Sequence, residues 1–438
     1  MNNPGSSSIK TPDLTKVKNH LLESISRAID TRDPNMENRR EMVTQFLIQA
    51  YQATKLQLPV TIRDQLFHEV LDELLGFGPL QPLLDDPDIS EIMVNGPKKI
   101  FIERKGKLTR TNVTFENDAE VLKIIDRIIL PLGRRIDFDS PTVDARLPDG
   151  SRVNAVIPPV AIDGPTITIR KFQKGRLSVD ELIEYDSITP TMAEFVKTCV
   201  LARLNIVISG GTGSGKTTLL NVLSSFIPDG ERIITIEDAA ELQLQQDHVL
   251  RMETKPTNSE GKYGIAIRDL VRNSLRMRPD RIVIGECRGG EALDMLQAMN
   301  TGHDGSLTTV HSNSPRDAIS RLETLCMMAG MDLPVRFIRQ QIASAVDVII
   351  QISRVKDGSR KVTSITEVSG MEGETVVMTE IFRFDQTGVT PEGKVQGEMK
   401  PSGIRPFFSE RLESAGLKLG PEVFGASISG MLNTRRNR

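Results

Sequence analysis

The sequence has no tryptophan and only three cysteines, and aromatic residues make up 4% of its 438 positions. Cys199, Cys287 and Cys326 are scattered and odd in number, so they offer neither a disulfide framework nor a CxxC metal site. No apolar run approaches the roughly 20 residues that a membrane-spanning helix needs, and the opening segment MNNPGSSSIKTPDLTKVKNH lacks the apolar core of a signal peptide. These absences predict a protein of the reducing cytosol with no membrane anchor of its own.

The chain also lacks an excess of either charge. Its 55 basic and 58 acidic side chains give a formal net charge of −3. Such a balance creates no overall attraction to nucleic acid or anionic lipid, and few aromatic rings are available to stack on unpaired bases. Composition therefore argues against a nucleic-acid-binding protein, although a local basic patch stays open.

The order of patterns along the chain predicts several domains. The first dozen residues are polar and rich in Pro, Gly and Ser, which is typical of a mobile tail. Apolar residues at three-to-four spacing then predict a small helical bundle, with helices over 14–29, 40–54 and 62–75. Residues 1–79 are therefore assigned to a tail and a helical segment.

Residues 80–172 change to short β-like runs, with one helix candidate over 119–130, and predict a small α/β domain. The polar stretch 173–187 is predicted to be a linker. In residues 188–438, apolar β-like runs such as NIVIS, RIITIE and RIVIGE alternate with helical patterns. That alternation predicts a mainly parallel sheet with helices on both faces.

A phosphate-binding loop follows the first of these runs. Residues 205–218 read NIVISGGTGSGKTT and match the Walker A spacing, between a β-like run and an amphipathic helix pattern. Glycines let backbone N–H groups approach phosphate, Lys216 reaches the β and γ oxygens, and Thr217 holds Mg²⁺. A tight turn before a helix is the plain alternative, but it leaves the Lys-Thr pair at this spacing unexplained. The predicted nucleotide contacts are Gly210, Gly211, Thr212, Gly213, Ser214, Gly215, Lys216, Thr217 and Thr218.

Two acidic clusters end later β-like runs, Glu237 with Asp238 in IITIEDAAEL and Glu286 in RIVIGECRGGEA. Ligands bind at the carboxyl ends of strands in an open parallel sheet, so carboxylates there are placed to hold Mg²⁺ through water and to orient an attacking water. Glu286 is predicted to polarise that water, and Glu237 to hold the metal together with Thr217. Capping of the following helix is the alternative for each acid, and Glu241 is assigned such a capping or solvated role.

Two histidines flank another β-like run in TGHDGSLTTVHSNS, His303 before it and His311 at its end. A zinc site is disfavoured because no further His or Cys lies nearby in the sequence. A γ-phosphate sensor at the end of a core strand fits better, while a hydrogen-bonded structural histidine stays open for His303.

Three arginines precede the predicted linker, Arg146 and Arg152 around the turn LPDG and Arg170 in PTITIRKF. A guanidinium fork matches phosphate oxygens, and an arginine inserted into a nucleotide site can stabilise transition-state charge. Surface ion pairs and a local hairpin remain the plain alternatives. The same alternatives apply to Arg276, Arg278 and Arg288, and the terminal TRRNR is interpreted as a solvated basic tail.

These motifs together resemble the type II/type IV secretion ATPases, which have a Walker A loop, an acidic box (TIEDAAEL), an atypical Walker B ending in Gly285 and Glu286, and a histidine box (GHDGSLTTVH) in this order. LDELLGFGPLQPLLDDPDISEIMVNGP and VDARLPDGSRVNAVIPP look most like the CpaF-type ATPases of Tad pilus assembly. The likeness runs from about residue 71 to about residue 384. The four-cysteine zinc module of many type II secretion members is missing, which argues against that branch.

The resemblance implies an α/β fold, with a RecA-like P-loop NTPase core preceded by a smaller α/β domain and an N-terminal helical segment. It also implies ATP and Mg²⁺ as cofactors, with ATP bound between two domains and arginines of the preceding domain contacting its phosphates. It implies a cytoplasmic homohexamer that is peripheral to the inner membrane and powers pilus assembly, with retraction open, by acting on membrane platform proteins. No nucleic acid and no direct membrane insertion are expected.

Other classes of P-loop protein remain to be weighed. A RecA-like nucleic-acid motor shares the core, and it is disfavoured by the charge balance and the low aromatic content. A small-molecule kinase does not explain the likeness in the amino-terminal domain. A GTPase is disfavoured because the sequence has no NKxD-type motif for reading guanine.

Overall fold

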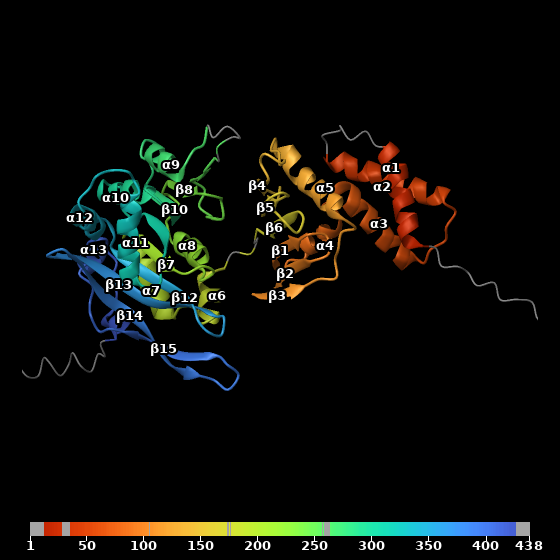
Figure 1. The fold of residues 1–438 in the computed structure, drawn as a ribbon. Coiled ribbons are helices and arrows are strands. Elements are labelled where there is room, and N and C mark those ends of the chain that lie inside the picture. The colour runs from red at the N-terminus through yellow and green to blue at the C-terminus, as the bar shows by residue number, and fades with distance from the viewer. Residues whose placement is uncertain are drawn as a thin grey trace, which may run out of the picture. The chain divides into compact units, whose positions relative to one another are not determined.

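The computed structural model describes residues 13–28, 36–104, 106–172, 175, 177–255, 257 and 263–425. The predicted tail over the first dozen residues and the basic terminus TRRNR lie outside the described residues, as does part of the predicted linker. The chain divides into two compact units, residues 1–174 and 175–438. Figure 1 shows the elements of each unit.

The first unit begins with the three predicted helices, α1 (Leu14–Ala28), α2 (Met36–Ala53) and α3 (Val60–Leu75). One apolar stripe of each helix meets the other two and forms a small separate core. Its fully buried members are Leu21, Ile25, Val43, Leu47, Leu66 and Val70. Two short elements follow, η1 (Gly78–Leu80) and α4 (Gln81–Asp85).

A six-stranded antiparallel sheet forms the rest of the first unit, in the order β3-β2-β1-β6-β5-β4. Its strands are β1 (Ile89–Asn95), β2 (Ile100–Arg104), β3 (Lys107–Arg110), β4 (Thr142–Arg146), β5 (Arg152–Val156) and β6 (Thr166–Arg170). Helix α5 (Asp118–Ile129) packs its apolar side on the sheet and is followed by η2 (Leu130–Leu132). Asn117 starts α5 by accepting a hydrogen bond from the Glu120 backbone. The sheet therefore has one apolar face and one polar face.

The second unit is built on a nine-stranded sheet in the order β15-β14-β13-β12-β7-β11-β10-β8-β9. Its strands are β7 (Ile206–Gly210), β8 (Ile233–Glu237), β9 (Val249–Glu253), β10 (Arg281–Cys287), β11 (Leu307–His311), β12 (Val348–Arg354), β13 (Arg360–Glu372), β14 (Thr375–Val389) and β15 (Val395–Pro401). All residues of β7 and β8 are buried, as expected for apolar strands covered on both sides.

The sheet of the second unit is mixed, so the expectation of a mainly parallel sheet holds for its larger part and not for all of it. Six strands, from β12 to β9 in the sheet order, pair in parallel. The last three are antiparallel, because β12, β13, β14 and β15 follow one another through short turns with no crossover helix. The α/β class holds, while the carboxyl-terminal part of the sheet is a meander.

Helices cover both faces of the parallel strands, as the sequence predicts. One face carries α6 (Val179–Glu184), α7 (Pro190–Leu201), α8 (Lys216–Ser224), α13 (Ser409–Ser414) and η3 (Pro421–Phe424). The other carries α9 (Ile267–Ser274), α10 (Glu291–Asn300), α11 (Pro315–Met327) and α12 (Val335–Ala345). Successive residues of β7 alternate between the two cores, with Ile206 and Ile208 in one and Val207 in the other. The carboxyl ends of the parallel strands therefore form one shared edge.

Candidate nucleotide-binding site

The glycine-rich loop lies between β7 and α8, at the carboxyl edge of the parallel strands. Gly213 and Gly215 have left-handed backbone angles, with φ of +69° and +98°, which glycine adopts without strain. A Cβ on Gly210 would lie 2.4 Å from the Ile352 carbonyl oxygen and 2.5 Å from Ser214 Oγ. The tight turn at the end of β7 therefore requires glycine at this position, and Lys216 becomes the first residue of α8.

Lys216 is largely buried at the mouth of this loop. Its Nζ donates a hydrogen bond to the Gly211 carbonyl at 3.0 Å. The same nitrogen lies 4.0 Å from Glu286 Oε1. Burial lowers the pKa of the lysine, and the Glu286 carboxylate opposes that effect. The structure thus brings together the loop lysine and the carboxylate predicted to polarise water, from elements far apart in the sequence.

Arg288 holds the other side of that carboxylate. Its Nε and Nη2 each lie 2.5 Å from Glu286 Oε2, and its Nη1 lies 3.5 Å from Asp238 Oδ2. Arg288 therefore bridges Glu286 to the acidic box that follows β8. For Arg288 the sequence left open a role in an ion pair instead of at phosphate. The structure shows such an ion pair, and its partner is Glu286, the residue predicted to polarise water.

Glu237 ends β8 and is 3% exposed. Its Oε2 accepts backbone hydrogen bonds from Glu241 at 2.8 Å and Leu242 at 3.0 Å, which fixes the acidic-box segment. Burial raises the pKa of Glu237 to about 7, and the two hydrogen bonds oppose that rise. Space for the side chain depends on Gly285, because a Cβ there would lie 2.9 Å from Glu237 Cγ.

The residues present are compatible with a Mg²⁺ ion. Glu237 Oε1 is buried with no hydrogen-bond partner among the described residues, so it has an unused lone pair for a metal-bound water. Thr217 follows Lys216 in the first turn of α8. Thr217 and Glu237 are thus the side chains that would hold the ion, which would supply charge neutralisation at the phosphates. In the described part of the chain, no three His, Cys, Asp or Glu side chains gather as a metal cluster.

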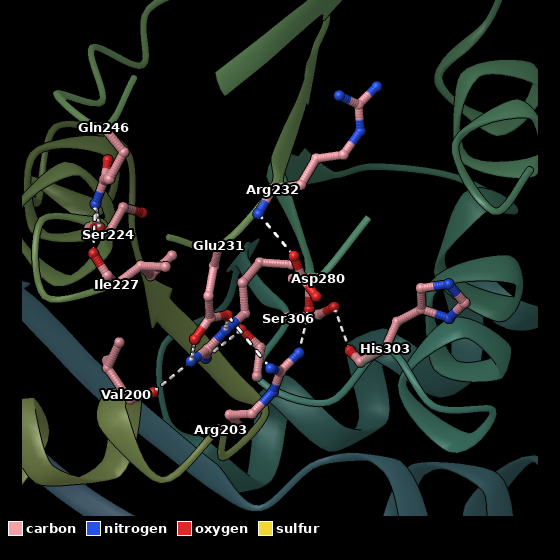
Figure 2. Close-up of polar contacts among 12 residues, drawn as sticks. Val200, Arg203, Ser224, Ile227, Glu231, Arg232, Gln246, Asp280, His303 and Ser306 are labelled. Carbon is pink, nitrogen blue, oxygen red and sulfur yellow. Dashed lines mark hydrogen bonds and ion pairs between the residues drawn. The ribbon is translucent and has the colours of Figure 1, made fainter. Parts of the chain in front are cut away.

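The two predicted histidines lie at opposite ends of β11. His311 is exposed at the carboxyl end and is paired in register with Gly210, the first residue of the glycine-rich loop. His303 precedes the strand, and its carbonyl accepts a hydrogen bond from Ser306 Oγ (Figure 2). Because Leu307 pairs with Ile206 at the start of β7, His303 lies at the amino edge of the sheet. The length of β11 therefore separates His303 from the glycine-rich loop, and the structural alternative that the sequence left open for His303 fits this position.

A buried ion pair that sequence reasoning missed lies at the same amino edge. Arg281 begins β10, is fully buried, and donates from Nε to Glu231 at 2.6 Å and from Nη2 to the Val200 carbonyl at 3.0 Å. Arg203 also pairs with Glu231, at 3.5 Å, and Figure 2 labels Val200, Arg203 and Glu231. The cluster ties the end of α7 to the segment before β8 and to the start of β10, so its role is structural.

The three arginines of the first unit form a row across its sheet. Arg146 is paired with Arg152, and Arg152 with Arg170, on the neighbouring strands β4, β5 and β6. Directly opposed residues of antiparallel strands point to the same face. That face is the polar one, because Val153 and Ala155 of β5 are buried on the other. The structure thus brings these three predicted residues together.

Strand, loop and helix together have the geometry of a phosphate-binding loop protein of the α/β class. The sequence pattern of the family described as "Type II/IV secretion system protein" matches residues 73–388. The chain therefore belongs to this family. Among the described helices, none is both long enough and apolar enough to cross a membrane.

Two relatives in sequence agree with this membership. A putative conjugal transfer protein of Mycobacterium tuberculosis is 36% identical over 313 residues, which cover 70% of this chain and 88% of that protein. The type IV secretion system protein PtlH of Bordetella pertussis is 34% identical over 305 residues, covering 63% of this chain and 88% of the relative. A solved structure, the VirB11 ATPase of the Brucella suis type IV secretion system in complex with sulphate, is 29% identical with a TM-score of 0.37, covering 66% of this chain and 94% of that one.

Proposed function

We propose that this chain is an ATP-hydrolysing motor of the secretion type. The observation that carries the proposal is the 4.0 Å approach of Lys216 Nζ to Glu286 Oε1 at the carboxyl edge of the parallel strands. A cation for the phosphates and a carboxylate for the attacking water are the two groups that nucleotide hydrolysis needs side by side. Membership of the Type II/IV secretion system protein family supports the same reaction class.

Each residue has a role in this proposal. Lys216 exchanges the Gly211 carbonyl for phosphate oxygens when nucleotide binds, and the loop N–H groups bind the remaining oxygens. Glu286 orients and polarises the attacking water, while Thr217 and Glu237 hold Mg²⁺. His311, next to Gly210, senses the γ-phosphate. The arginine row of Arg146, Arg152 and Arg170 supplies further phosphate contacts. No catalytic role is proposed for His303.

The work that hydrolysis drives is proposed to be assembly of a Tad-type pilus, with retraction open. The support is the likeness of two segments, residues 71–97 and 143–159, to the CpaF-type ATPases. A motor of this kind acts as a homohexamer and pushes on inner-membrane platform proteins from the cytoplasmic side. Mass photometry with a non-hydrolysable ATP analogue is expected to show six subunits, and a monomer at micromolar concentration would count against the motor.

Hydrolysis itself is tested with Lys216→Ala, beside the control Lys197→Ala at an exposed lysine of α7. The Lys216 variant is expected to lose Mg²⁺-dependent ATP hydrolysis because it removes the charge facing the transferred phosphoryl group, while the control keeps it. Equal turnover in both variants would end the assignment. Stimulation of the wild-type protein by DNA or RNA would instead favour a RecA-like nucleic-acid motor.

A further inference from the structure

The hairpin between β12 and β13 lies beside the glycine-rich loop. Ile352 of β12 is paired in register with Gly210, the last residue of β7. Arg354 and Arg360 close the hairpin as a cross-strand pair two residues farther along. The hairpin therefore extends past the end of β7, where the loop begins. Its turn is fixed, because Asp357 accepts backbone hydrogen bonds from Ser359 at 2.8 Å and from Val395 at 2.7 Å.

Arg360 reaches from this hairpin onto the loop. Its Nε donates a hydrogen bond to the Gly213 carbonyl at 3.0 Å. Its Cδ lies 3.2 Å from the position that a Cβ on Gly215 would take, so the side chain covers the outer surface of the loop. The described residues offer Arg360 no carboxylate within ion-pair distance, so the contact does not follow from a surface salt bridge.

The bond to Gly213 fixes the orientation of one peptide group. In a planar trans peptide the carbonyl and the next N–H point to opposite sides. The Gly213 carbonyl points outward to Arg360, and the Ser214 N–H points across the loop to the Gly211 carbonyl at 3.4 Å. That carbonyl also accepts from Lys216 Nζ, so the Ser214 N–H faces the place where phosphate would bind. The peptide follows Gly213, which has a left-handed backbone and no Cβ to restrict its carbonyl, so the Arg360 contact supplies a restraint that the glycine does not.

We propose that Arg360 is a positioning residue of the phosphate loop, which it holds with the Ser214 N–H directed at the phosphates. The inference rests on the proposed nucleotide binding and assigns part of the site to the antiparallel end of the sheet. Arg360 acts on the loop and not on the nucleoside. Its loss therefore weakens the binding of every ligand that carries a pyrophosphate group.

The test measures dissociation constants of ADP and of inorganic pyrophosphate, each with Mg²⁺, for the full chain and three variants. Arg360→Ala is expected to raise both constants about tenfold, the size of one hydrogen bond to a charged group. Arg360→Lys keeps a donor and the charge but loses the guanidinium fork. Its two dissociation constants are expected to lie between those of the wild type and those of Arg360→Ala. The matched control is Arg354→Ala, which removes the same charge from the same hairpin, because Arg354 makes no hydrogen bond to the loop among the described residues.

ATP turnover gives a second readout that a merely structural role would not produce. Arg360→Ala is expected to raise KM about tenfold and to change kcat by less than about twofold, because it weakens binding in the ground and transition states alike. Without nucleotide, Arg360→Ala should have the same melting temperature as the wild type. If its melting temperature differs, pyrophosphate binding by Arg360→Lys alone decides whether Arg360 positions the loop.

Each outcome separates this inference from the proposed function. A wild-type protein that binds neither ADP nor pyrophosphate refutes the proposed function. Normal binding in the wild type with unchanged constants in Arg360→Ala refutes only the inference. If Arg360→Ala binds ADP more weakly but pyrophosphate normally, Arg360 contacts the nucleoside. If Arg354→Ala loses as much ADP and pyrophosphate binding as Arg360→Ala, the effect is one of general charge. Both of these results overturn the positioning role.

Discussion

Replacing Glu237 by glutamine should change the pH dependence of stability. The Glu237 side chain is 3% exposed, and burial raises its pKa from 4.5 to about 7. Between these two pH values the folded protein keeps a proton that the unfolded chain has lost, so stability falls as pH rises from 4.5 to 7. Above pH 7 the whole cost of ionising the buried carboxyl is present. Glutamine has no charge to bury at any of these pH values.

The magnitude follows from the difference between the two pKa values. Raising the pKa from 4.5 to about 7 corresponds to about 3 kcal/mol of folding free energy at pH 8.5 and to less than about 1 kcal/mol at pH 5. The glutamine NH₂ group can lack a hydrogen-bond partner, but that cost is the same at both pH values. The difference between the two pH values therefore isolates the carboxylate.

Scanning calorimetry of the metal-free protein in the presence of a chelator measures this difference. Relative to wild type, Glu237→Gln should raise the melting temperature of the second unit, residues 175–438, more at pH 8.5 than at pH 5. The expected gap is about 5 to 10 °C for a unit of this size. A chelator is needed because Mg²⁺ favours the ionised form. An equal shift at both pH values would refute the conclusion that burial dominates at Glu237.

Three further substitutions test other contacts. Gly285→Ala places a Cβ 2.9 Å from Glu237 Cγ, so it should destabilise the second unit by about 1–3 kcal/mol and lower ATP turnover; a fully active, equally stable variant would contradict the packing argument. Glu231→Gln leaves the buried Arg281 without its counter-charge and should cost about 3–5 kcal/mol in denaturation experiments, while ADP binding to the folded protein persists. Arg288→Ala releases the carboxylate that it holds and should lower kcat about tenfold at an unchanged dissociation constant for ADP; weaker ADP binding would place Arg288 on the nucleotide instead.

The parallel part of the fold could be predicted because its strands are continuous apolar runs that alternate with amphipathic helices. The meander could not, because β14 has mostly exposed or half-buried residues and no run of more than two buried ones. The predicted linker, residues 173–187, contains the helix α6, and the sequence contains a helix-start pattern at this place. Ser178 and Glu181 form a capping box at the start of that helix, and Leu182 is buried in the core of the second unit.

The candidate site could be predicted where it depends on strand order alone. Lys216 and Glu286 meet because the carboxyl ends of parallel strands share one edge. His303 does not join them, because a whole strand separates it from His311, and the spacing of residues cannot tell the two ends apart. Arg360 lies 147 residues from Gly213 in the sequence, and only the pairing of β12 with β7 brings the two together.

Single-turnover hydrolysis by Glu286→Gln, measured beside nucleotide affinity, tests the central claim most directly. Glutamine keeps the shape of the side chain and one hydrogen-bonding carbonyl, but it cannot polarise water as a carboxylate does. The account predicts unchanged Mg²⁺-ATP affinity and hydrolysis that is slower by about 10²–10⁴-fold. Hydrolysis at the wild-type rate would contradict the account, and Glu237 would then be the next candidate for the catalytic carboxylate.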